Sequence, residues 1–320
     1  MFRPSGHRTV LVPHATPTLY PTPPVTQLVL IALVGFVAQL VDGSLGMAYG
    51  VTSTTLLLAV GLSPAVASAS VHFSEVGTTA ASGLSHLRFG NVDWPTVRRI
   101  ALPGGIGAFL GATVLVNVSA AAAKPIIAVF LLVLGLYVVY RFSVLALNGR
   151  RRPAWSRKRL GVLGLVAGFL DAAGGGGWGP IATPTLLVSD TLPPNKVVGS
   201  VDASEFVVAL AASLGFLIGL GHAEIAWPIV AALLISGVAA APLAAWLVKI
   251  VPPRLLGVGA GGLIVLTNSR TLMQAAGVGE RPMAIAYLGL VATWTVALVW
   301  TILRVRRERE VVAETVNAHG

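Results

Sequence analysis

Hydrophobic residues are grouped in runs separated by short polar or proline-containing turns, and the same order of runs occurs twice. Most runs approach the roughly 20 residues that an α-helix needs to cross a bilayer. The second run of each half is too short, since ten helical residues cover only about 15 Å. The predicted helical segments are 26–42, 51–60, 65–87, 96–118 and 124–142, then 160–172, 178–189, 195–220, 225–248 and 254–273, with 283–303 lacking a counterpart.

Individual residues repeat along with the runs. The stretch GFVAQLVDGSLGMAYG, which begins at Gly35, matches GLVAGFLDAAGGGGWG, which begins at Gly164. Asp171 lies 129 positions after Asp42, and with a one-residue insertion Glu205 matches Glu75. A carboxylate inside an apolar membrane segment is costly unless it faces a cavity or a partner. Acidic residues at corresponding places in two halves therefore predict a site between the halves.

Composition indicates a membrane protein. Mean hydropathy is +0.82, 55% of residues are hydrophobic and 11% are charged, whereas soluble domains carry about 25% charged residues. There is no cysteine, so disulfides and thiolate metal sites are excluded. A proline-rich extension, 1–25, is expected to be disordered rather than a cleaved signal peptide. The other predicted units are the repeats 26–142 and 160–275, the linker 143–159, the extra transmembrane helix 283–303 and the tail 304–320.

The net charge of +10 does not predict nucleic-acid binding, because the basic residues gather just outside the apolar runs. Such residues set orientation in the membrane and attract anionic lipid headgroups. The two clusters are Arg150, Arg151, Arg152, Arg157, Lys158 and Arg159 in the linker, and Arg304, Arg306, Arg307 and Arg309 in the tail.

The short segments leave two topologies open. If the first two runs of each half form a re-entrant hairpin, each half has three full crossings and the halves are inverted. If those two runs instead cross the membrane once as a broken helix, the halves are parallel. The inverted arrangement places both basic clusters and Lys249 in the cytoplasm, in agreement with the positive-inside rule. Its cost is that Arg270 and Arg281 lie outside. We therefore predict an all-α, polytopic fold of two inverted repeats with one extra C-terminal span.

The glycine-rich interruptions are the predicted substrate site. Broken helices at matching places in two halves indicate a transporter's binding site, and a half-helix that begins at membrane depth presents unpaired N–H groups to an anion. The alternative is that these glycines only pack or kink helices. The candidate substrate-binding residues are Asp42, Gly43, Ser44, Gly46, Gly50, Ser70, His72, Ser74, Asp171, Gly174, Gly175, Gly176, Gly177, Trp178, Gly179, Ser200, Asp202 and Ser204.

A second acidic pair follows the short segments. His72, Glu75, Thr79, Ser82 and His86 are spaced by three and four residues and form one polar stripe on a helix. Glu75 and Glu205 are the candidates for proton coupling, with carboxylates and histidine exchanging protons. The alternative for the aspartates is structural: Asp42 and Asp171 cap the second short helices. Both roles are compatible, since a cap at a half-helix also builds the site.

Motifs of other classes are missing. The chain has no HExxH, no GxSxG and no GxxxxGK[ST] sequence, and its histidines do not show a known metal-ligand spacing. We therefore predict no enzymatic activity, no metal and no cofactor.

The sequence resembles the TauE/SafE family of membrane transporters. The first copy, GFVAQLVDGSLGMAYGVTSTTLL followed by ASASVHFSEVGTTAASGLSH, is similar to the first half of that family, and GFLDAAGGGGWGPIATPTLL followed by VGSVDASEF to its second half. The first copy has Ala48 and Tyr49 where the family pattern has glycines. The resemblance implies a bacterial or archaeal inner-membrane protein that arose by duplication and exports small anions such as sulfite and organosulfur compounds.

These observations predict a multi-pass membrane protein of the inner cell membrane that moves a small anion, with Glu75 and Glu205 as the candidates for coupling this movement to protons. The alternatives are uptake of thiosulfate-like or carboxylate anions, and a ligand-binding membrane subunit or sensor that does not transport. The expected partners are the anion and membrane lipid, with no nucleic acid, and the sequence leaves open whether the chain forms a homo-oligomer.

Overall fold

The fold was obtained as a computed structural model, which describes residues 23–45, 47, 49–143, 155–189, 192–247 and 253–318. This part of the chain is helical and contains no strand. The predicted extension before residue 23, most of the predicted linker and Gly46 lie outside the described residues. The helices are α1 (Val25–Leu45), α2 (Tyr49–Ala59), α3 (Pro64–Arg88), α4 (Trp94–Val116), α5 (Ala120–Ser143), α6 (Arg157–Gly174), α7 (Trp178–Ser189), α8 (Pro194–Leu220), α9 (Trp227–Leu247), α10 (Pro253–Ala275) and α11 (Glu280–Ala318), with a 3-10 turn at His222–Glu224.

The helices begin and end close to the predicted limits of the apolar runs. Several N-termini are capped by a side chain that precedes the run: the Ser63 hydroxyl accepts from the N–H of Val66, and Asp93 accepts from that of Thr96. Proline occupies the first turn of α3 and α4, where its missing N–H costs nothing. α11 continues without interruption through the basic segment after residue 303.

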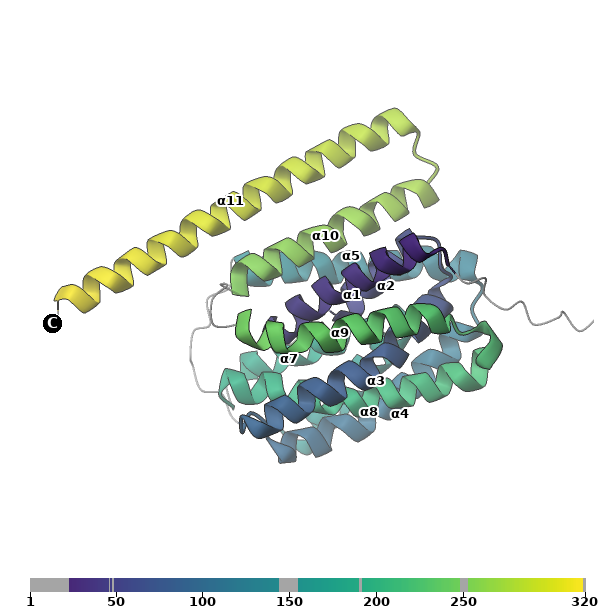
Figure 1. The fold of residues 1–320 in the computed structure, drawn as a ribbon, viewed down its shortest axis with the longest axis horizontal. Helices are drawn as coiled ribbons and strands as arrows, with labels where there is room; N and C mark the ends of the chain where they lie inside the picture. Colours follow the sequence, from purple (N-terminus) through teal and green to yellow (C-terminus); the bar gives the residue numbers. More distant parts are fainter. Residues whose placement is uncertain are drawn as a thin grey trace, which may run out of the picture.

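The two halves interdigitate, as Figure 1 shows. α6 lies along α4 and α1 lies along α9, so the first helix of each half packs on the fourth helix of the other. Small residues allow α4 and α6 to pack closely. A Cβ atom at Gly107 would overlap the main-chain carbonyl of Leu165, and one at Gly168 would overlap that of Gly104. The backbones of α4 and α6 therefore touch, and glycine is what allows it.

Corresponding helices of the two halves also pack on each other, and they run in opposite directions. Near the start of α3, the ring of His72 contacts Phe216, near the end of α8, at 5.9 Å between centroids. Near the end of α3, Gly83 instead faces Ala203, near the start of α8. α5 and α10 are antiparallel in the same way, since a Cβ at Gly135 would lie 2.8 Å from Ile264 and Gly257 packs on Phe142.

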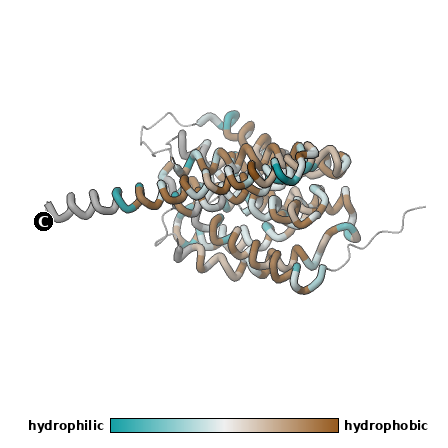
Figure 2. Tube along the Cα trace, turned by 90° about the horizontal axis from the view of Figure 1, so that it is seen from above, coloured by the Kyte–Doolittle hydropathy of each residue, from teal (hydrophilic) through white to brown (hydrophobic). Residues whose placement is uncertain are grey.

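The outside of the bundle is apolar. Five helical segments in the described part of the chain are long and apolar enough to cross a membrane by length and composition: Val25–Gly43, Trp94–Val116, Ala120–Ser143, Lys196–Leu220 and Glu280–Arg307. Large hydrophobic side chains such as Leu30, Leu102 and Ile218 are exposed, and Figure 2 shows hydrophobic residues along the outer helices. A surface of this kind is expected where lipid replaces water.

α11 lies at the edge of the fold and packs on α10 (Figure 1). The indole N–H of Trp294 donates to the carbonyl of Val258 at 2.9 Å, and the Arg304 guanidinium donates to the carbonyl of Ser143 at 2.8 Å. The helix contributes little to the interior, so the candidate site is built from α1 to α10.

The contact between α4 and α6 yields a test. Replacing Gly107 by alanine places a methyl group against the main chain of Leu165, and overpacking of this kind costs about 1–3 kcal/mol. We expect a clear fall in the thermal unfolding temperature of the detergent-purified protein. Gly289→Ala is the matched control, because a Cβ at Gly289 in α11 meets nothing within 4 Å. Equal melting temperatures for the two variants would contradict a close backbone contact.

Candidate functional site

The two helix breaks, one from each half, meet inside the bundle. A Cβ atom at Gly50 would lie 2.9 Å from the Cα of Gly176. One at Gly175 would overlap the side chain of Thr54. Gly175 and Gly176 have φ angles of 73° and 141°, a backbone region that other residues rarely adopt. The glycine-rich turn between α6 and α7 thus rests against the first turn of α2.

Each break is closed by its own aspartate. The Asp171 Oδ1 atom accepts hydrogen bonds from the N–H groups of Gly177 at 2.7 Å and Trp178 at 2.9 Å. Asp42 Oδ1 accepts from the N–H of Tyr49 at 3.2 Å. Asp171 therefore caps α7, and Asp42 caps α2, which confirms the capping role predicted for both residues.

The caps change how an anion could bind. In this conformation the first N–H groups of α7 already donate to a carboxylate, and Pro180 in the same turn has no N–H to offer. Asp171 thus occupies the position that a substrate anion would take at this helix terminus. An anion that binds there has to displace Asp171 or share its donors.

His72 links Asp171 to the second acidic pair. Its Nε2 atom lies 3.5 Å from Asp171 Oδ2, and its Nδ1 atom lies 3.3 Å from Glu75 Oε2. The side chains of His72, Glu75 and Asp171 are buried, and their facing atoms have no hydrogen bond within the described structure. A buried polar atom without a hydrogen-bond partner costs free energy. Protons shared between these groups, or a bound ligand, would supply the missing partners.

These three residues could in principle hold a metal ion. One ligand atom from each of His72, Glu75 and Asp171 can be chosen so that all three lie within 4.8 Å of one another. A metal ion would bind one ring nitrogen, so both carboxylates would have to reach the ion on that side of the ring. Here the two nitrogens of His72 face different carboxylates, an arrangement better suited to protons that bridge the ring to each side.

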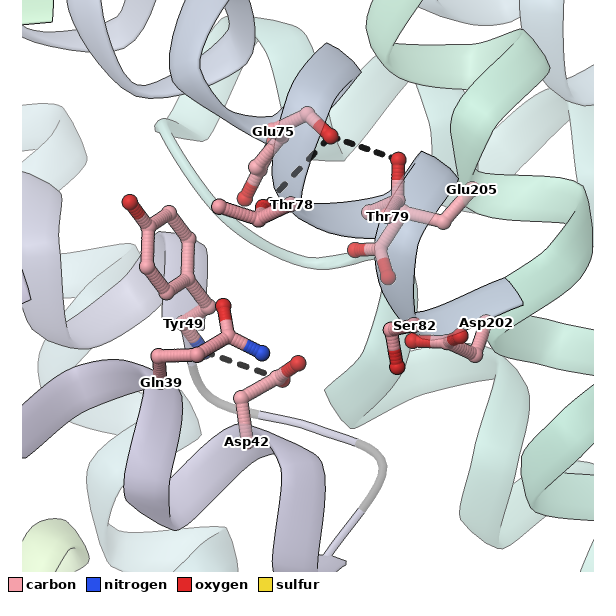
Figure 3. Close-up of a pocket in the computed structure, with 9 residues that line it drawn as sticks. All are labelled: Gln39, Asp42, Tyr49, Glu75, Thr78, Thr79, Ser82, Asp202 and Glu205. Atoms are coloured by element: carbon pink, nitrogen blue, oxygen red, sulfur yellow. Dashed lines mark hydrogen bonds between the residues drawn. The ribbon is translucent and has the colours of Figure 1, made fainter. Parts of the chain in front are cut away.

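An acidic pocket adjoins this cluster. The narrow gaps between its lining side chains add up to about 190 Å³, but none of these gaps is wide enough to hold a water molecule. In Figure 3 its walls come from α1, α2, α3 and α8. Four carboxylates and no lysine or arginine line it, and the hydroxyls of Thr78 and Thr79 donate to the main-chain carbonyl of Glu75. The lining residues are Gln39, Asp42, Tyr49, Glu75, Thr78, Thr79, Ser82, Asp202 and Glu205.

Comparison with known proteins decides the family. The sequence profile described as "Sulfite exporter TauE/SafE" matches residues 31–271. The chain belongs to this family. It is also 49% identical, over 296 residues, to a protein of Bacillus subtilis (strain 168) named "Probable membrane transporter protein YtnM", and the match covers 92% of this chain and 98% of that relative. No solved structure matches the chain. The resemblance found in the two glycine-rich motifs is thus confirmed, and the protein is a multi-pass membrane transporter.

The predicted site residues of this TauE/SafE transporter separate into three groups. Gly50, Gly175, Gly176, His72, Glu75 and Asp171 come together where the breaks meet. Asp42, Glu75, Asp202 and Glu205 line the acidic pocket. The remaining described glycines and Trp178 are packed in the interior. Gly43 packs on Ala244, both Gly174 and Gly177 pack on Phe130, and Trp178 and Gly179 are buried. Gly46 and the side chain of Ser44 lie outside what the structure describes.

The predicted serines of α3 and α8 form hydrogen bonds within the protein. The Ser70, Ser74 and Ser204 hydroxyls donate to carbonyls of their own helices. Ser74 also contacts the Tyr49 hydroxyl at 3.1 Å. Ser200 accepts from the N–H of Asp93 at 2.7 Å and so ties α8 to the start of α4. These serines hold the helices in place around the site.

Three pocket residues and one break residue were not predicted. Gln39 lies three positions before Asp42 on α1, so its helical spacing could have indicated a shared face. Thr78 extends the polar stripe of α3, and Tyr49 donates its hydroxyl to the Leu233 carbonyl at 3.3 Å. No sequence pattern indicated Thr54, because its contact with Gly175 is between residues of different halves that lie far apart in the chain.

The cap on α2 can be tested by comparing two variants that both remove the charge of Asp42. Asparagine can still accept from the N–H of Tyr49, whereas alanine leaves that group without its partner. We expect Asp42→Ala to be less stable than Asp42→Asn by about 1 kcal/mol. Thermal unfolding in detergent measures the difference, and equal stability would show that the hydrogen bond does not hold the break.

Proposed function

We propose that this TauE/SafE transporter moves a small oxyanion across the inner cell membrane at the place where the two helix breaks meet. The candidates are sulfite, a sulfonate or a related organosulfur compound, and the proposed direction is export. The observation that carries the proposal is the contact between Gly50 and Gly176, which joins one break from each half. The family description supports the substrate class.

Hydrogen-bond donors near the contact support an anion as ligand. Thr52, Ser53 and Thr54 lie in the first turns of α2, are buried, and have hydroxyls without a partner among the described residues. Thr54 lies against Gly175 at the opposite break. Neutral donors and helix N-termini can bind an anion without a buried lysine or arginine. We propose that these hydroxyls act together with the predicted residues of the two breaks.

Coupling to protons is the second part of the proposal. Glu75 and Glu205 occupy matching places in the two halves and line the same acidic pocket. Four carboxylates packed this closely inside a membrane protein cannot all be charged without compensating cations. We propose that Glu75 and Glu205 carry the coupling protons.

The packing supports two inverted repeats. If the halves were parallel, corresponding helices would be related by an axis along the membrane normal and would run in the same direction. α3 and α8 are instead antiparallel, as are α5 and α10. We propose that α1–α2 and α6–α7 are re-entrant hairpins, that the 143–159 linker and the 304–320 tail lie in the cytoplasm, and that lipid and the anion are the partners.

Flux measurements test the function. Purified protein in proteoliposomes is expected to exchange external [35S]sulfite or [14C]sulfoacetate for the same unlabelled anion inside. A binding subunit or sensor would show saturable binding without exchange. Faster exchange of thiosulfate or of a carboxylate than of sulfite and sulfoacetate would show that the proposed substrate class is wrong. It would not contradict the proposed location of the site.

The break itself is tested by Gly175→Val. A β-branched residue at a φ angle of 73° costs about 1–2 kcal/mol and meets the side chain of Thr54. Since about 1.4 kcal/mol is tenfold in rate, we expect exchange to fall about tenfold or more. Gly259→Val is the control, because a Cβ at Gly259 in α10 meets nothing within 4 Å. Similar losses in both variants, at matched expression, would mean that the break is not the site.

Topology is tested with single cysteines in this cysteine-free chain. We expect a cysteine at Ala223, in the turn between α8 and α9, to react with an impermeant maleimide from outside intact cells. A cysteine at Ala313 in the C-terminal segment should react only after the membrane is opened, because basic segments stay inside. External labelling at Ala313 would exclude the inverted arrangement.

A further inference from the structure

Asp171 has two carboxylate oxygens with different neighbours. Oδ1 accepts from the N–H groups of Gly177 and Trp178 and so holds the N-terminus of α7. Oδ2 has no hydrogen bond within the described structure and lies 3.5 Å from His72 Nε2. The opposite nitrogen of the same ring lies 3.3 Å from Glu75 Oε2. One imidazole therefore connects the helix break of the second half with the acidic pocket.

The surroundings of His72 supply negative charge but few cations. The other ionisable groups that interact with the cluster are Asp42 of α1, Tyr49 of α2 and Glu205 of α8, and Asp202 of α8 interacts in turn with Glu205. α7 and α9 contain no ionisable side chain. The basic residues of α4 and α5 lie toward the ends of those helices, at Arg98, Arg99, Lys124 and Arg141. Protons are thus the available counter-charges at the centre.

The ring of His72 is also held in place. It is fully buried and meets Phe216 edge-on, at 5.9 Å between centroids and 80° between planes. A ring fixed in this way keeps one nitrogen toward each carboxylate, which is the geometry needed to pass a proton from one side to the other.

We propose that Glu75, His72 and Asp171 form a proton relay that opens the N-terminus of α7 to the substrate, so that the transporter is a proton–anion symporter. This inference rests on the proposed function and adds the direction in which the proton moves relative to the anion. The anion and the proton move in the same direction, because the site accepts the anion only when Asp171 is neutral. Export is therefore driven by the outward gradient of the anion itself, and an imposed inward proton gradient drives uptake.

The proton transfer balances as follows. A proton on Glu75 Oε2 passes to His72 Nδ1, while the proton on His72 Nε2 passes to Asp171 Oδ2. The ring ends neutral with its proton on the other nitrogen, Glu75 becomes a carboxylate, and Asp171 becomes a neutral acid. One proton has crossed from the acidic pocket to the helix break.

Neutral Asp171 then competes less well for the α7 terminus. Hydrogen bonds to an ionised acceptor are roughly twice as strong as those to a neutral one, and the helix dipole favours a negative charge at this end. A substrate oxyanion gains both contributions when it replaces the neutral acid at the N–H groups of Gly177 and Trp178. Release of the anion lets Asp171 ionise again and close the terminus.

The test uses proteoliposomes of the full chain with [14C]sulfoacetate, whose sulfonate stays ionised across the pH range. Two quantities are compared: exchange at equal pH on both sides, and net uptake driven by an imposed proton gradient. The wild type should show both, with an internal pH dye reporting proton entry together with the anion. His72→Gln keeps a hydrogen-bonding side chain but cannot relay a proton, so we expect the ratio of gradient-driven uptake to exchange to fall about tenfold or more.

Asp171→Asn provides an independent variant. Asparagine can still accept from the N–H groups of α7, yet it carries no proton, so the same ratio should fall; this variant carries the test if His72→Gln does not fold. The control is His86→Gln, on the same helix but at its end near Asn91, which should respond as the wild type does. A wild-type gradient response in both relay variants, or protons that leave as the anion enters, would overturn the relay. Absence of any anion flux in the wild type would instead remove the proposed function itself.

Discussion

The structure depends on satisfying the backbone N–H groups that are exposed where a helix is broken in an apolar interior. Water is not available there, so each free group would cost several kcal/mol. Asp171 meets this need at α7 and Asp42 at α2. A carboxylate is a strong acceptor for this purpose, but it also brings a negative charge into the site. The cap therefore ties the integrity of the fold to the protonation of the site.

Glycine packing determines where these breaks lie. The backbones of α4 and α6 touch at Gly107 and Gly168, and those of the two breaks approach each other at Gly50 and Gly176. Each contact joins residues of different halves. Neither half contains a complete site, since Glu75 and His72 come from one and Asp171 from the other. The candidate site therefore forms only when helices from both parts of the chain have packed together.

A transporter whose centre is lined by carboxylates needs protons or cations to approach neutrality, whatever it carries. The pocket between α1, α2, α3 and α8 has four carboxylates and no basic side chain. Thr54 of α2, whose hydroxyl has no partner among the described residues, lies against the glycine turn. In the proposed mechanism the carboxylates take up protons and the hydroxyl of Thr54 helps to bind the oxyanion. His72 links the two regions, because its ring nitrogens face Glu75 and Asp171.

Sequence alone determined the membrane class, the limits of most helices and the family, because hydrophobic runs and glycine motifs are local features of the chain. It also identified Asp42, Glu75, Asp171 and Glu205, since a carboxylate in an apolar run stands out. It left open whether the aspartates cap or bind, because both roles require the same residue at the same position. Only the tertiary structure paired His72 with Asp171 and Thr54 with Gly175. Those contacts depend on how the halves cross, and no spacing along the chain records that geometry.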